Sequence, residues 1–374
     1  MKKILLITRG IPTKGNPMWG NFELDQAKAL RDYGHKVVCL SIDRNIRLNG
    51  LKFGFTRTTV EGIKMYSFML PLPERLLPRE AVNAIIDVAF KYCVKRIHAE
   101  EGVFDVVHGH YLKNIRLATK YTAPVKVGTE HWSELKRSRI KKSVKLDARE
   151  AYPALDRLIT VSYPMQEIIR KEFEIDSEFV GCVIDSVFEY APRIDDTNFR
   201  FIAVGSLFKI KGFDIAIKAF ARAGFSKDIH FHIIGDGSER AALQRLIEDL
   251  NLVEQVTLEG RKTREEIMKL MRNSSAYVLS SRSENFATAC MEALCAGIPA
   301  LMTECGGPED FVDDKSAFLV PVEDIDAMSE GMKYMVNNIN NYDGKKISES
   351  IKAKYAPSAI AQQLTSIYDK ITNK

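Results

Sequence analysis

The chain has 374 residues, a length that accommodates two domains of ordinary size. Apolar residues make up 45% and charged residues 28%, which excludes a wholly disordered chain and a fibrous repeat protein. The 54 basic and 49 acidic residues leave a net charge of +5, which is too small at this length to indicate a nucleic-acid-binding protein.

The six cysteines are scattered, with no CxxC pair and no histidine at zinc spacing. Neither a metal site nor a disulfide framework is indicated, and we expect reduced, mostly buried thiols. The first apolar run, 4–7, is too short for a signal sequence, and no run of about 18 apolar residues predicts a transmembrane helix. We therefore expect a cytoplasmic protein whose only membrane contact would be peripheral, at the inner face of the cell membrane.

The first half of the chain alternates short apolar runs with helix-like segments, a pattern that is typical of a parallel α/β sheet. In chain order, strands are expected at 4–7, 37–42, 104–108, 125–128 and 158–161. Helices are expected at 22–33, around 80–100 and at 165–173.

A second α/β run follows. Its expected strands are 201–204, 230–234, 256–258, 276–279 and 298–301, and its expected helices are 214–223, 239–250, 264–274 and 288–296. The stretch 176–198 carries Pro192 with several Asp and Asn residues, which favours a domain boundary there. The fold class predicted is α/β, with two Rossmann-like parallel-sheet domains facing a cleft in which a ligand would bind.

The segment 281–299 follows an expected strand, opens an expected helix and holds two glutamates eight positions apart, Glu284 and Glu292. At 1.5 Å per residue they lie roughly 12 Å apart, farther than the roughly 5–10 Å of a glycosidase carboxylate pair. This spacing suits two hydroxyl clusters of one elongated ligand, and the helix N-terminus between them offers N–H groups to a phosphate. Two solvated surface carboxylates are the alternative.

Two glycine-containing loops accompany this segment. The first, 205–212, follows the strand at 201–204 and carries Lys211, a point charge suited to a diphosphate. The second, 305–310, contains Gly-Gly-Pro and follows the strand after the helix of Glu292. Each motif alone is weak evidence for phosphate binding, because a glycine loop between a strand and a helix is common.

Five motifs occur in order along the chain: Lys211-Gly212, 232–237, the Glu284/Glu292 pair, 296–299 and Gly306-Gly307. Together they resemble a family 4 retaining glycosyltransferase with the GT-B fold, over nearly the whole chain. The resemblance implies transfer of a sugar from a nucleotide-sugar donor with retention of the anomeric configuration. It implies that Glu284 contacts the donor sugar, that Glu292 holds the ribose and that the basic loop neutralises the diphosphate.

The resemblance also implies the domain limits. An N-terminal acceptor-side domain would span 1–180 and receive a C-terminal helix, 357–374, and a donor-binding domain would span 181–356. The loop 15–22 and the strand ends bearing His110 and His131 would face the cleft. We expect His108 to point the opposite way from His110 and to serve packing.

The catalytic residues expected from these matches are His131, Glu284 and Lys211. The expected donor-binding residues are Gly20, His110, Gly205, Ser206, Lys209, Lys211, Gly235, Asn285, Phe286, Ala287, Thr288 and Glu292. Four positions depart from the family pattern: Ser206 stands where many relatives have Arg, Asn285 and Ala287 stand where the usual residue is Gly, and Cys182 stands where relatives often have Asn. Lys209 would supply part of the charge missing at Ser206, without the bidentate contact of an arginine.

No metal or other cofactor is expected, because the acids of the one DxD match, Asp324 and Asp326, are explained by capping of the helix that follows. The basic stretch 136–145 is either a solvated loop or a contact with anionic lipid or a lipid-diphosphate acceptor. The segment 51–77 could add apolar insertion into a membrane.

The function predicted is metal-independent, retaining hexosyl transfer, with a UDP-sugar as the default donor, to a glycan or lipid-linked acceptor in bacterial surface polysaccharide synthesis. Two alternatives stay open: a nucleotide-sugar 2-epimerase of the same fold, and a non-catalytic nucleotide-binding partner of another glycosyltransferase, which Ser206 and Ala287 suggest. An NAD oxidoreductase is disfavoured because no GxGxxG follows the first strand.

Overall fold

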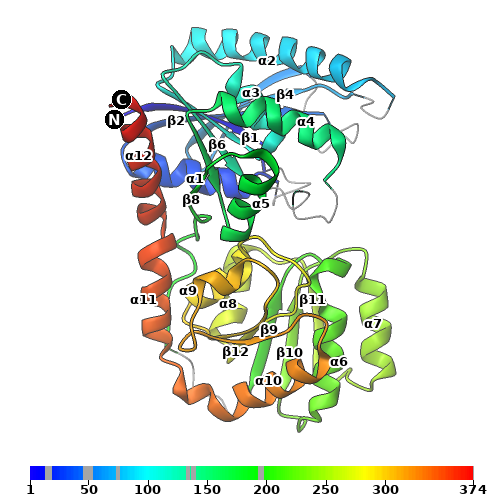
Figure 1. Cartoon of the computed structure of the whole chain (residues 1–374). Helices are drawn as coiled ribbons and strands as arrows, with labels where there is room; N and C mark the ends of the chain where they lie inside the picture. Colours follow the sequence, from blue (N-terminus) through cyan, green and yellow to red (C-terminus); the bar gives the residue numbers. More distant parts are fainter. Residues whose placement is uncertain are drawn as a thin grey trace. The chain divides into compact units, whose positions relative to one another are not determined.

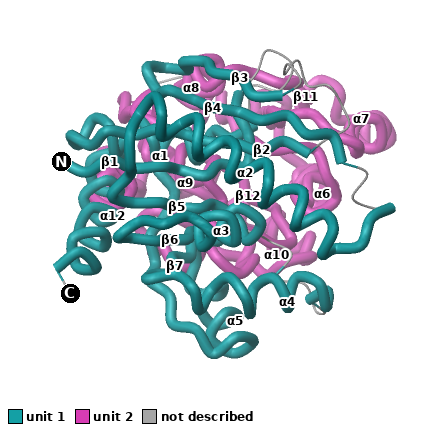
Figure 2. The backbone as a smooth tube through the Cα atoms, turned by 90° about the horizontal axis from the view of Figure 1, so that it is seen from above, with its two compact units in different colours: residues 1–183, 357–374 teal, residues 184–356 magenta. Residues whose placement is uncertain are grey.

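The structure is a computed structural model, and it describes residues 1–12, 19–44, 54–72, 76–131, 135, 140–192 and 198–373. The chain divides into two compact units (Figure 2). Unit 1 comprises residues 1–183 and 357–374, and unit 2 comprises residues 184–356. The chain leaves unit 1 at Val183, close to the boundary expected at residue 180, and returns to it at Pro357.

Unit 1 is built on an eight-stranded sheet with the order β3-β4-β2-β1-β5-β6-β7-β8. Its strands are β1 (Lys3–Thr8), β2 (Lys36–Asp43), β3 (Gly54–Val60), β4 (Ile63–Met69), β5 (Val106–His110), β6 (Val125–Glu130), β7 (Arg157–Thr160) and β8 (Glu178–Phe179). Its helices are α1 (Asn21–Asp32), α2 (Arg79–Glu101), α3 (Tyr111–Thr119), α4 (Lys142–Ala151), α5 (Tyr163–Phe173) and α12 (Pro357–Thr372). Only the pairing of β3 with β4 is antiparallel among the described strands.

The central strands of unit 1 are buried on both faces, as expected for a parallel sheet covered by helices. Alternate residues of β1 point to opposite faces, so Leu5 packs in the cluster that includes Phe90 of α2, and Leu6 faces the other side. Next to Leu6 in the sheet, His108 bonds to Tyr368 of α12 at 2.8 Å. Helix α12 therefore closes the face opposite α2, where it lies against α1 (Figure 1).

Most of the described part of segment 51–77, which could have added apolar insertion into a membrane, belongs to the sheet of unit 1. Strands β3 and β4 form a hairpin whose turn residues, Glu61 and Gly62, both have positive φ angles, of 47° and 79°. This is the geometry of a type I′ turn, which matches the twist of paired strands. Met65 and Tyr66 of β4 are fully buried in the core of unit 1, so their side chains are not available to contact a membrane. Residues 51–53 and 73–75 lie outside the described residues.

Unit 2 is built on a six-stranded parallel sheet with the order β11-β10-β9-β12-β13-β14. Its strands are β9 (Arg200–Val204), β10 (His230–Ile234), β11 (Val256–Gly260), β12 (Ala276–Leu279), β13 (Ala300–Thr303) and β14 (Ala317–Val320). Its helices are α6 (Phe213–Ala223), α7 (Arg240–Asp249), α8 (Arg264–Arg272), α9 (Thr288–Cys295), α10 (Ile325–Asn338) and α11 (Gly344–Tyr355). Strand β13 begins two residues later than expected. Gly297 has a φ of 88°, outside the range of a strand, and Pro299 has no N–H group to donate to a neighbouring strand.

In both sheets the strand order changes direction at a central strand. Strand β1 lies between β2 and β5, and β9 lies between β10 and β12. Open parallel sheets bind ligands at the carboxyl ends of the strands that flank such a reversal. The loops after β1 and β5 in unit 1, and after β9 and β12 in unit 2, are therefore the places where functional side chains are expected.

The cysteines and the helix lengths were also predicted from the sequence. All six cysteines are free and buried, which confirms the expectation of unpaired thiols. Burial raises the pKa of Cys93 to about 12 and that of Cys295 to about 11. In the part of the chain that the structure describes, no helix combines the length and the apolar character needed to cross a bilayer.

Candidate functional site

Glycines bring three loops of unit 2 into backbone contact. Gly235 has a φ of 144°, and a Cβ there would lie 1.8 Å from the carbonyl oxygen of Gly205. Gly212 has a φ of 64°, and a Cβ there would lie 1.9 Å from the carbonyl oxygen of Ser280. Both positions therefore require glycine, and they hold the loops after β9, β10 and β12 against one another.

Two of the residues predicted to be catalytic are in direct contact. Lys211 Nζ lies 2.6 Å from Glu284 Oε1, which also accepts a 2.7 Å hydrogen bond from the Ser281 hydroxyl. Lys211 follows β9 and Glu284 follows β12, so the reversal point of the sheet brings them together across 73 positions of sequence. The side chain of Glu284 is only 11% exposed. A cation and a carboxylate therefore stand side by side where a ligand with phosphate and hydroxyl groups could contact both.

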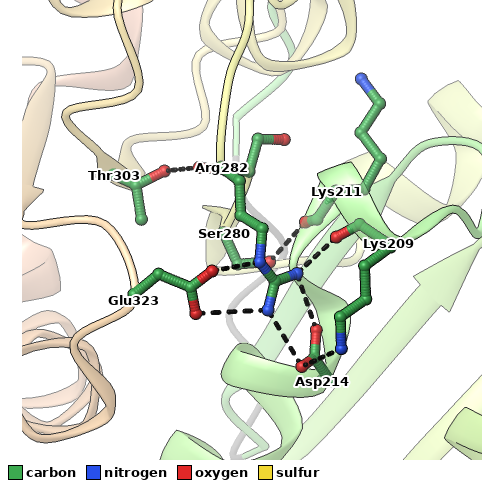
Figure 3. A network of polar contacts seen from close by, with 8 residues as sticks. Lys209, Lys211, Asp214, Ser280, Arg282, Thr303 and Glu323 are labelled. Atoms are coloured by element: carbon green, nitrogen blue, oxygen red, sulfur yellow. Dashed lines mark hydrogen bonds and ion pairs between the residues drawn. The ribbon is translucent and has the colours of Figure 1, made fainter. Parts of the chain in front are cut away.

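Arg282 holds this arrangement in place, although the sequence analysis gave it no role (Figure 3). Its two terminal nitrogens lie 3.0 Å from the two carboxylate oxygens of Asp214, and it also bonds to Glu323 and to the carbonyl oxygen of Lys209. Burial raises the pKa of Asp214, but the hydrogen bonds from Arg282 and Lys209 outweigh this and hold it below its usual value. Arg282 thereby fixes the loop that carries Lys211.

Lys209, which was expected to supply part of the charge missing at Ser206, does not reach Glu284. Lys209 Nζ lies 3.4 Å from Asp214, and its side chain is 70% exposed. Figure 3 shows the side chain of Lys211 extending away from the Arg282 contacts, whereas Lys209 reaches back to them. Ser206 is exposed on the same loop.

The segment from Glu284 to Glu292 combines a packed side chain with an uncapped helix. The ring of Phe286 is buried against Phe311 and Tyr355, at centroid distances of 5.2 and 5.1 Å, so Phe286 anchors the loop by packing. The backbone of Ala287 is left-handed, with a φ of 50°, and α9 starts at Thr288 without a side-chain cap. Glu292, on the same helix, is 8% exposed.

In the loop 305–310, the N–H groups of the glycine pair are bonded within the loop itself. The N–H groups of Gly306 and Gly307 donate to the two carboxylate oxygens of Glu309, at 2.6 and 2.9 Å. A Cβ on Gly307 would lie 2.2 Å from the carbonyl oxygen of Asn285, so this loop also supports the segment that begins at Glu284.

In unit 1, three histidines gather at the carboxyl ends of β5 and β6. His110 Nδ1 lies 3.1 Å from His131 Nε2, and the rings of His108 and His110 stack at 4.7 Å. The prediction that His108 points away from His110 is wrong, because residues two apart on a strand share a face. Gln26 of α1 contacts both of those rings, at 3.5 and 3.3 Å.

Burial keeps this histidine cluster neutral. It lowers the pKa of His110 to about 3 and the pKa values of His108 and His131 well below their usual range, with further lowering of the latter two by neighbouring charges. The backbone N–H of His131 donates to Glu130, whose other oxygen accepts from the Tyr152 hydroxyl. A neutral imidazole donates one hydrogen bond and accepts one, and both nitrogens of His110 are engaged, by Gln26 and by His131.

The loop after β1 adds a residue that the sequence analysis missed. The guanidinium of Arg9 lies 4.6 Å from the ring centroid of Trp19 and 4.9 Å from that of Tyr111. Gly20, with a φ of 83°, caps α1, and a Cβ there would lie 2.3 Å from the carbonyl oxygen of Gly10. The sequence signal that could have identified Arg9 is its position directly after β1. Residues 15–18 of the predicted loop lie outside the described residues.

The two acids of the DxD match have structural roles, and Asp324 caps a helix as predicted. The carboxylate of Asp324 caps α10 by accepting from the N–H of Ala327 at 2.8 Å, and Asp326 pairs with Arg222. Across the described ranges, no three His, Cys, Asp or Glu side chains are grouped so that they could hold a metal ion.

The basic stretch 136–145 is described only from residue 140 onward. Lys142 begins α4, and Lys145 pairs with Glu172 of α5. Residues 136–139, which carry three of the six basic side chains of this stretch, lie outside the described residues. Contact of this stretch with lipid stays a prediction.

We expect Arg282→Met to destabilise unit 2 by about 3 kcal/mol, because it leaves the part-buried Asp214 without its main partner. Chemical unfolding of wild type and variant, followed by circular dichroism, measures this change. Arg222→Met is the matched control, since its partner Asp326 is exposed and the pair is expected to contribute less than 1 kcal/mol. Equal unfolding midpoints for Arg282→Met and the control would contradict the role given to Arg282.

Comparison with known protein families decides the classification. The family model described as Glycosyltransferase Family 4 matches residues 21–185, and the model described as Glycosyl transferases group 1 matches residues 188–352. The chain belongs to glycosyltransferase family 4. Its two α/β units have the GT-B fold, as predicted from the ordered motifs.

Individual proteins resemble the chain at low sequence identity. N-acetyl-alpha-D-glucosaminyl L-malate synthase of Bacillus anthracis is 23% identical over 178 residues, which are 47% of this chain and 46% of the relative. The matches span about half the length of the first curated relatives. Among solved structures, sucrose-phosphate synthase of Thermosynechococcus elongatus superposes with a TM-score of 0.78 at 18% identity over 100% of both chains. The Anabaena protein HepE in complex with UDP superposes with a TM-score of 0.73 at 16% identity, over 99% of this chain and 100% of HepE.

Proposed function

We propose that the protein is a retaining, metal-independent glycosyltransferase that uses a UDP-sugar and glycosylates a glycan or lipid-linked acceptor in bacterial surface polysaccharide synthesis. The observation that carries this proposal is the contact of Lys211 with Glu284 at the reversal point of the unit 2 sheet. The structure of HepE with UDP and the N-acetylglucosaminyl group in the name of the B. anthracis relative support UDP-N-acetylglucosamine as the first donor to test.

In the proposed complex, the donor replaces contacts that the chain now makes with itself. The diphosphate takes Lys211 from Glu284 and lies at the uncapped N-terminus of α9, whose N–H groups and dipole favour an anion. Glu284 is then available to accept from hydroxyl groups of the sugar, and Glu292 from those of the ribose. Arg282 keeps the Lys211 loop in position throughout.

The proposed transfer breaks the bond between the anomeric carbon of the sugar and the diphosphate oxygen. The acceptor hydroxyl forms its bond to the same face of that carbon, and its proton passes to the departing phosphate oxygen. Lys211 and the N–H groups of α9 stabilise the charge that develops on the leaving diphosphate. His131, which is neutral and held by His110, is suited to hydrogen-bond a sugar hydroxyl or a phosphate without adding charge. A lipid-linked acceptor would bring the stretch 136–145 to an anionic membrane surface.

We expect Glu292→Ala to weaken UDP binding by at least tenfold, because it removes charge-assisted hydrogen bonds to the ribose. Isothermal titration calorimetry with UDP and with uridine measures this, and both should weaken alike because they share the ribose. Glu292→Gln keeps the shape of this nearly buried side chain and removes its charge, so it can replace Glu292→Ala in the test if that variant does not fold. Glu248→Ala on the exposed face of α7 is the control. Equal UDP affinity in Glu292→Ala and the control would contradict the assignment of this site.

A further inference from the structure

Arg9 of unit 1 carries a positive charge to which the proposed transfer gives no role. Its guanidinium lies over two aromatic rings, 4.6 Å from the ring centroid of Trp19 and 4.9 Å from that of Tyr111. Contacts with aromatic faces hold a guanidinium in place and leave its N–H groups available for hydrogen bonds. The row of rings continues from Tyr111 to His131, at a centroid distance of 4.9 Å, and so links Arg9 to the histidine cluster.

The hydrogen-bonding capacity of this guanidinium is not used by the described chain. A guanidinium carries five N–H donors, and within the described ranges none of those of Arg9 donates to an acceptor or forms an ion pair. Glu23 is close, because its Oε1 accepts from the backbone N–H of Arg9 at 2.9 Å, but it makes no ion pair with the guanidinium. By contrast, the buried Arg116 and the half-buried Arg282 each pair with a carboxylate.

Three buried polar atoms at this place have no hydrogen-bond partner among the residues that the structure describes. They are Nε of Arg9, Nε1 of Trp19 and Oε2 of Glu23, whose side chain is fully buried. Buried polar atoms are seldom left unbonded, because each one loses its hydration without compensation. Two donors and one acceptor without partners therefore point to a polar group that binds here from outside the chain.

The two rings beside Arg9 are held in position at unusual backbone sites. Tyr111 has a φ of 65°, in the left-handed region that bulky residues seldom adopt. The Trp19 ring packs on Gly10, where a Cβ would lie 1.7 Å from Trp19 Nε1, so glycine is required there. A strained non-glycine residue that persists in the folded state is typical of binding and catalytic sites.

This row of side chains lies where an open α/β sheet binds its ligands. Arg9 follows β1, Tyr111 follows β5 and His131 follows β6, and these three strands are neighbours at the point where the strand order changes direction. Trp19, Arg9, Tyr111 and His131 are all half-buried. The row therefore keeps part of its surface available to a molecule bound to unit 1.

We infer that Arg9 binds the carboxylate or phosphate group of an acidic sugar, and that this sugar is the acceptor. A guanidinium binds either anion through two parallel N–H···O bonds, and the neighbouring rings offer apolar surface to the carbon skeleton of the sugar. Glu23 offsets the charge of Arg9 in part, so the preference for an anion comes from charge-assisted hydrogen bonds to the unused N–H groups. This inference rests on the proposed function, because it identifies the chemical class of the acceptor of that reaction.

The test titrates the whole chain with glucose, glucuronate and glucose 6-phosphate, with UDP present at saturation so that the donor site is occupied. These sugars share a ring and differ at the sixth carbon, so the two acidic ones separate carboxylate from phosphate recognition. Calorimetry measures the affinity. In a Trp132→Phe background Trp19 is the only tryptophan of the chain, and its fluorescence reports binding beside Arg9.

Two variants remove different properties of the guanidinium. Arg9→Met removes the charge, whereas Arg9→Lys keeps the charge and removes the planar arrangement of N–H groups. Arg96→Met is the matched control in the same unit, because Arg96 also lies over two rings, those of Phe55 and Tyr92, at 4.8 and 5.8 Å. Arg96 is exposed on α2, and its guanidinium donates to the Tyr92 hydroxyl at 3.0 Å.

Glucuronate or glucose 6-phosphate is expected to bind at least tenfold more tightly than glucose and to change the fluorescence of Trp19. Arg9→Met is expected to abolish this preference, Arg9→Lys to reduce it, and Arg96→Met to leave it unchanged. Circular dichroism checks the fold, and Arg9→Lys alone decides the test if Arg9→Met does not fold.

The inference is overturned if neither acidic sugar binds more tightly than glucose, or if the Arg9 variants bind it as tightly as Arg96→Met does. It is also overturned if Arg9→Met weakens UDP and spares the acidic sugar, since Arg9 would then serve the donor. UDP binding to the unmodified chain separates the two proposals. Its persistence without binding of an acidic sugar removes only the acceptor inference, whereas its absence counts against the proposed function.

Discussion

Lys211→Met is expected to slow sugar transfer from UDP-N-acetylglucosamine by about 10²–10³-fold, because it removes a preorganised positive charge from the leaving diphosphate. In the free protein this charge lies 2.6 Å from Glu284, on a loop that Arg282 holds in place. The variant should also weaken UDP far more than uridine, since only UDP carries the diphosphate. Release of UDP from the donor, followed with a coupled assay, measures the rate.

Lys218→Met on the exposed face of α6 makes the same change of charge within unit 2 and serves as the control. Circular dichroism of both variants checks that the fold is kept. Equal losses of UDP and uridine affinity, or a rate for Lys211→Met that matches the control, would contradict the placement of the diphosphate at Lys211.

Unit 1 is expected to lose about 4 kcal/mol of stability between pH 7.5 and pH 5.5. His108, His110 and His131 stay neutral in the folded state because burial lowers their pKa values, whereas each takes up a proton near pH 6.5 once unfolded. Between those two pKa values the unfolded state binds more protons, so stability is full above about pH 6.5 and declines as the pH falls. Each histidine contributes about 1.4 kcal/mol by pH 5.5.

Other groups modify this trend without reversing it. The pKa values of His35 and His98 are also lowered, mainly by burial, and act in the same direction. Burial raises the pKa of Glu23, which acts in the opposite direction.

Tryptophan fluorescence can isolate this effect, because both tryptophans of the chain, at positions 19 and 132, belong to unit 1. Urea unfolding curves at a series of pH values give the free energy of unfolding of that unit. His110→Asn should reduce the pH dependence by about a third of the expected loss, since it removes one of three equivalent contributions. A free energy of unfolding that does not fall between pH 7.5 and 5.5 would contradict the neutral histidine cluster.

Local sequence patterns were enough to locate the candidate site, because its chemistry is concentrated in loops that follow buried strands. The glycines at 212 and 235 and the Lys211 and Glu284 motifs each belong to a loop after a strand that flanks or adjoins the reversal point of the unit 2 sheet. The contact between the last two could be anticipated only from the order of the strands, since it joins residues 73 positions apart.

The features that were missed depend on contacts between distant parts of the chain. Arg282 acquires its role from Asp214, 68 positions away, and from Glu323, 41 positions away. The hairpin of β3 and β4 turns at Glu61-Gly62, a weaker turn signal than Asn-Gly, and β3 has mostly exposed or half-buried side chains that give little apolar pattern. The mistaken orientation of His108 is different, because the period of two in a strand predicts that it shares a face with His110.

The identity of the sugar anomer released from the donor tests the proposed reaction most directly. In the proposed transfer, water can take the place of the acceptor hydroxyl, so no knowledge of the acceptor is needed. The protein is mixed with UDP-α-N-acetylglucosamine and EDTA, and proton NMR records the first free sugar before the anomers equilibrate. We expect α-N-acetylglucosamine to appear first and EDTA to leave its rate of release unchanged. Release of the β anomer first, or turnover that EDTA abolishes, would contradict the proposed reaction.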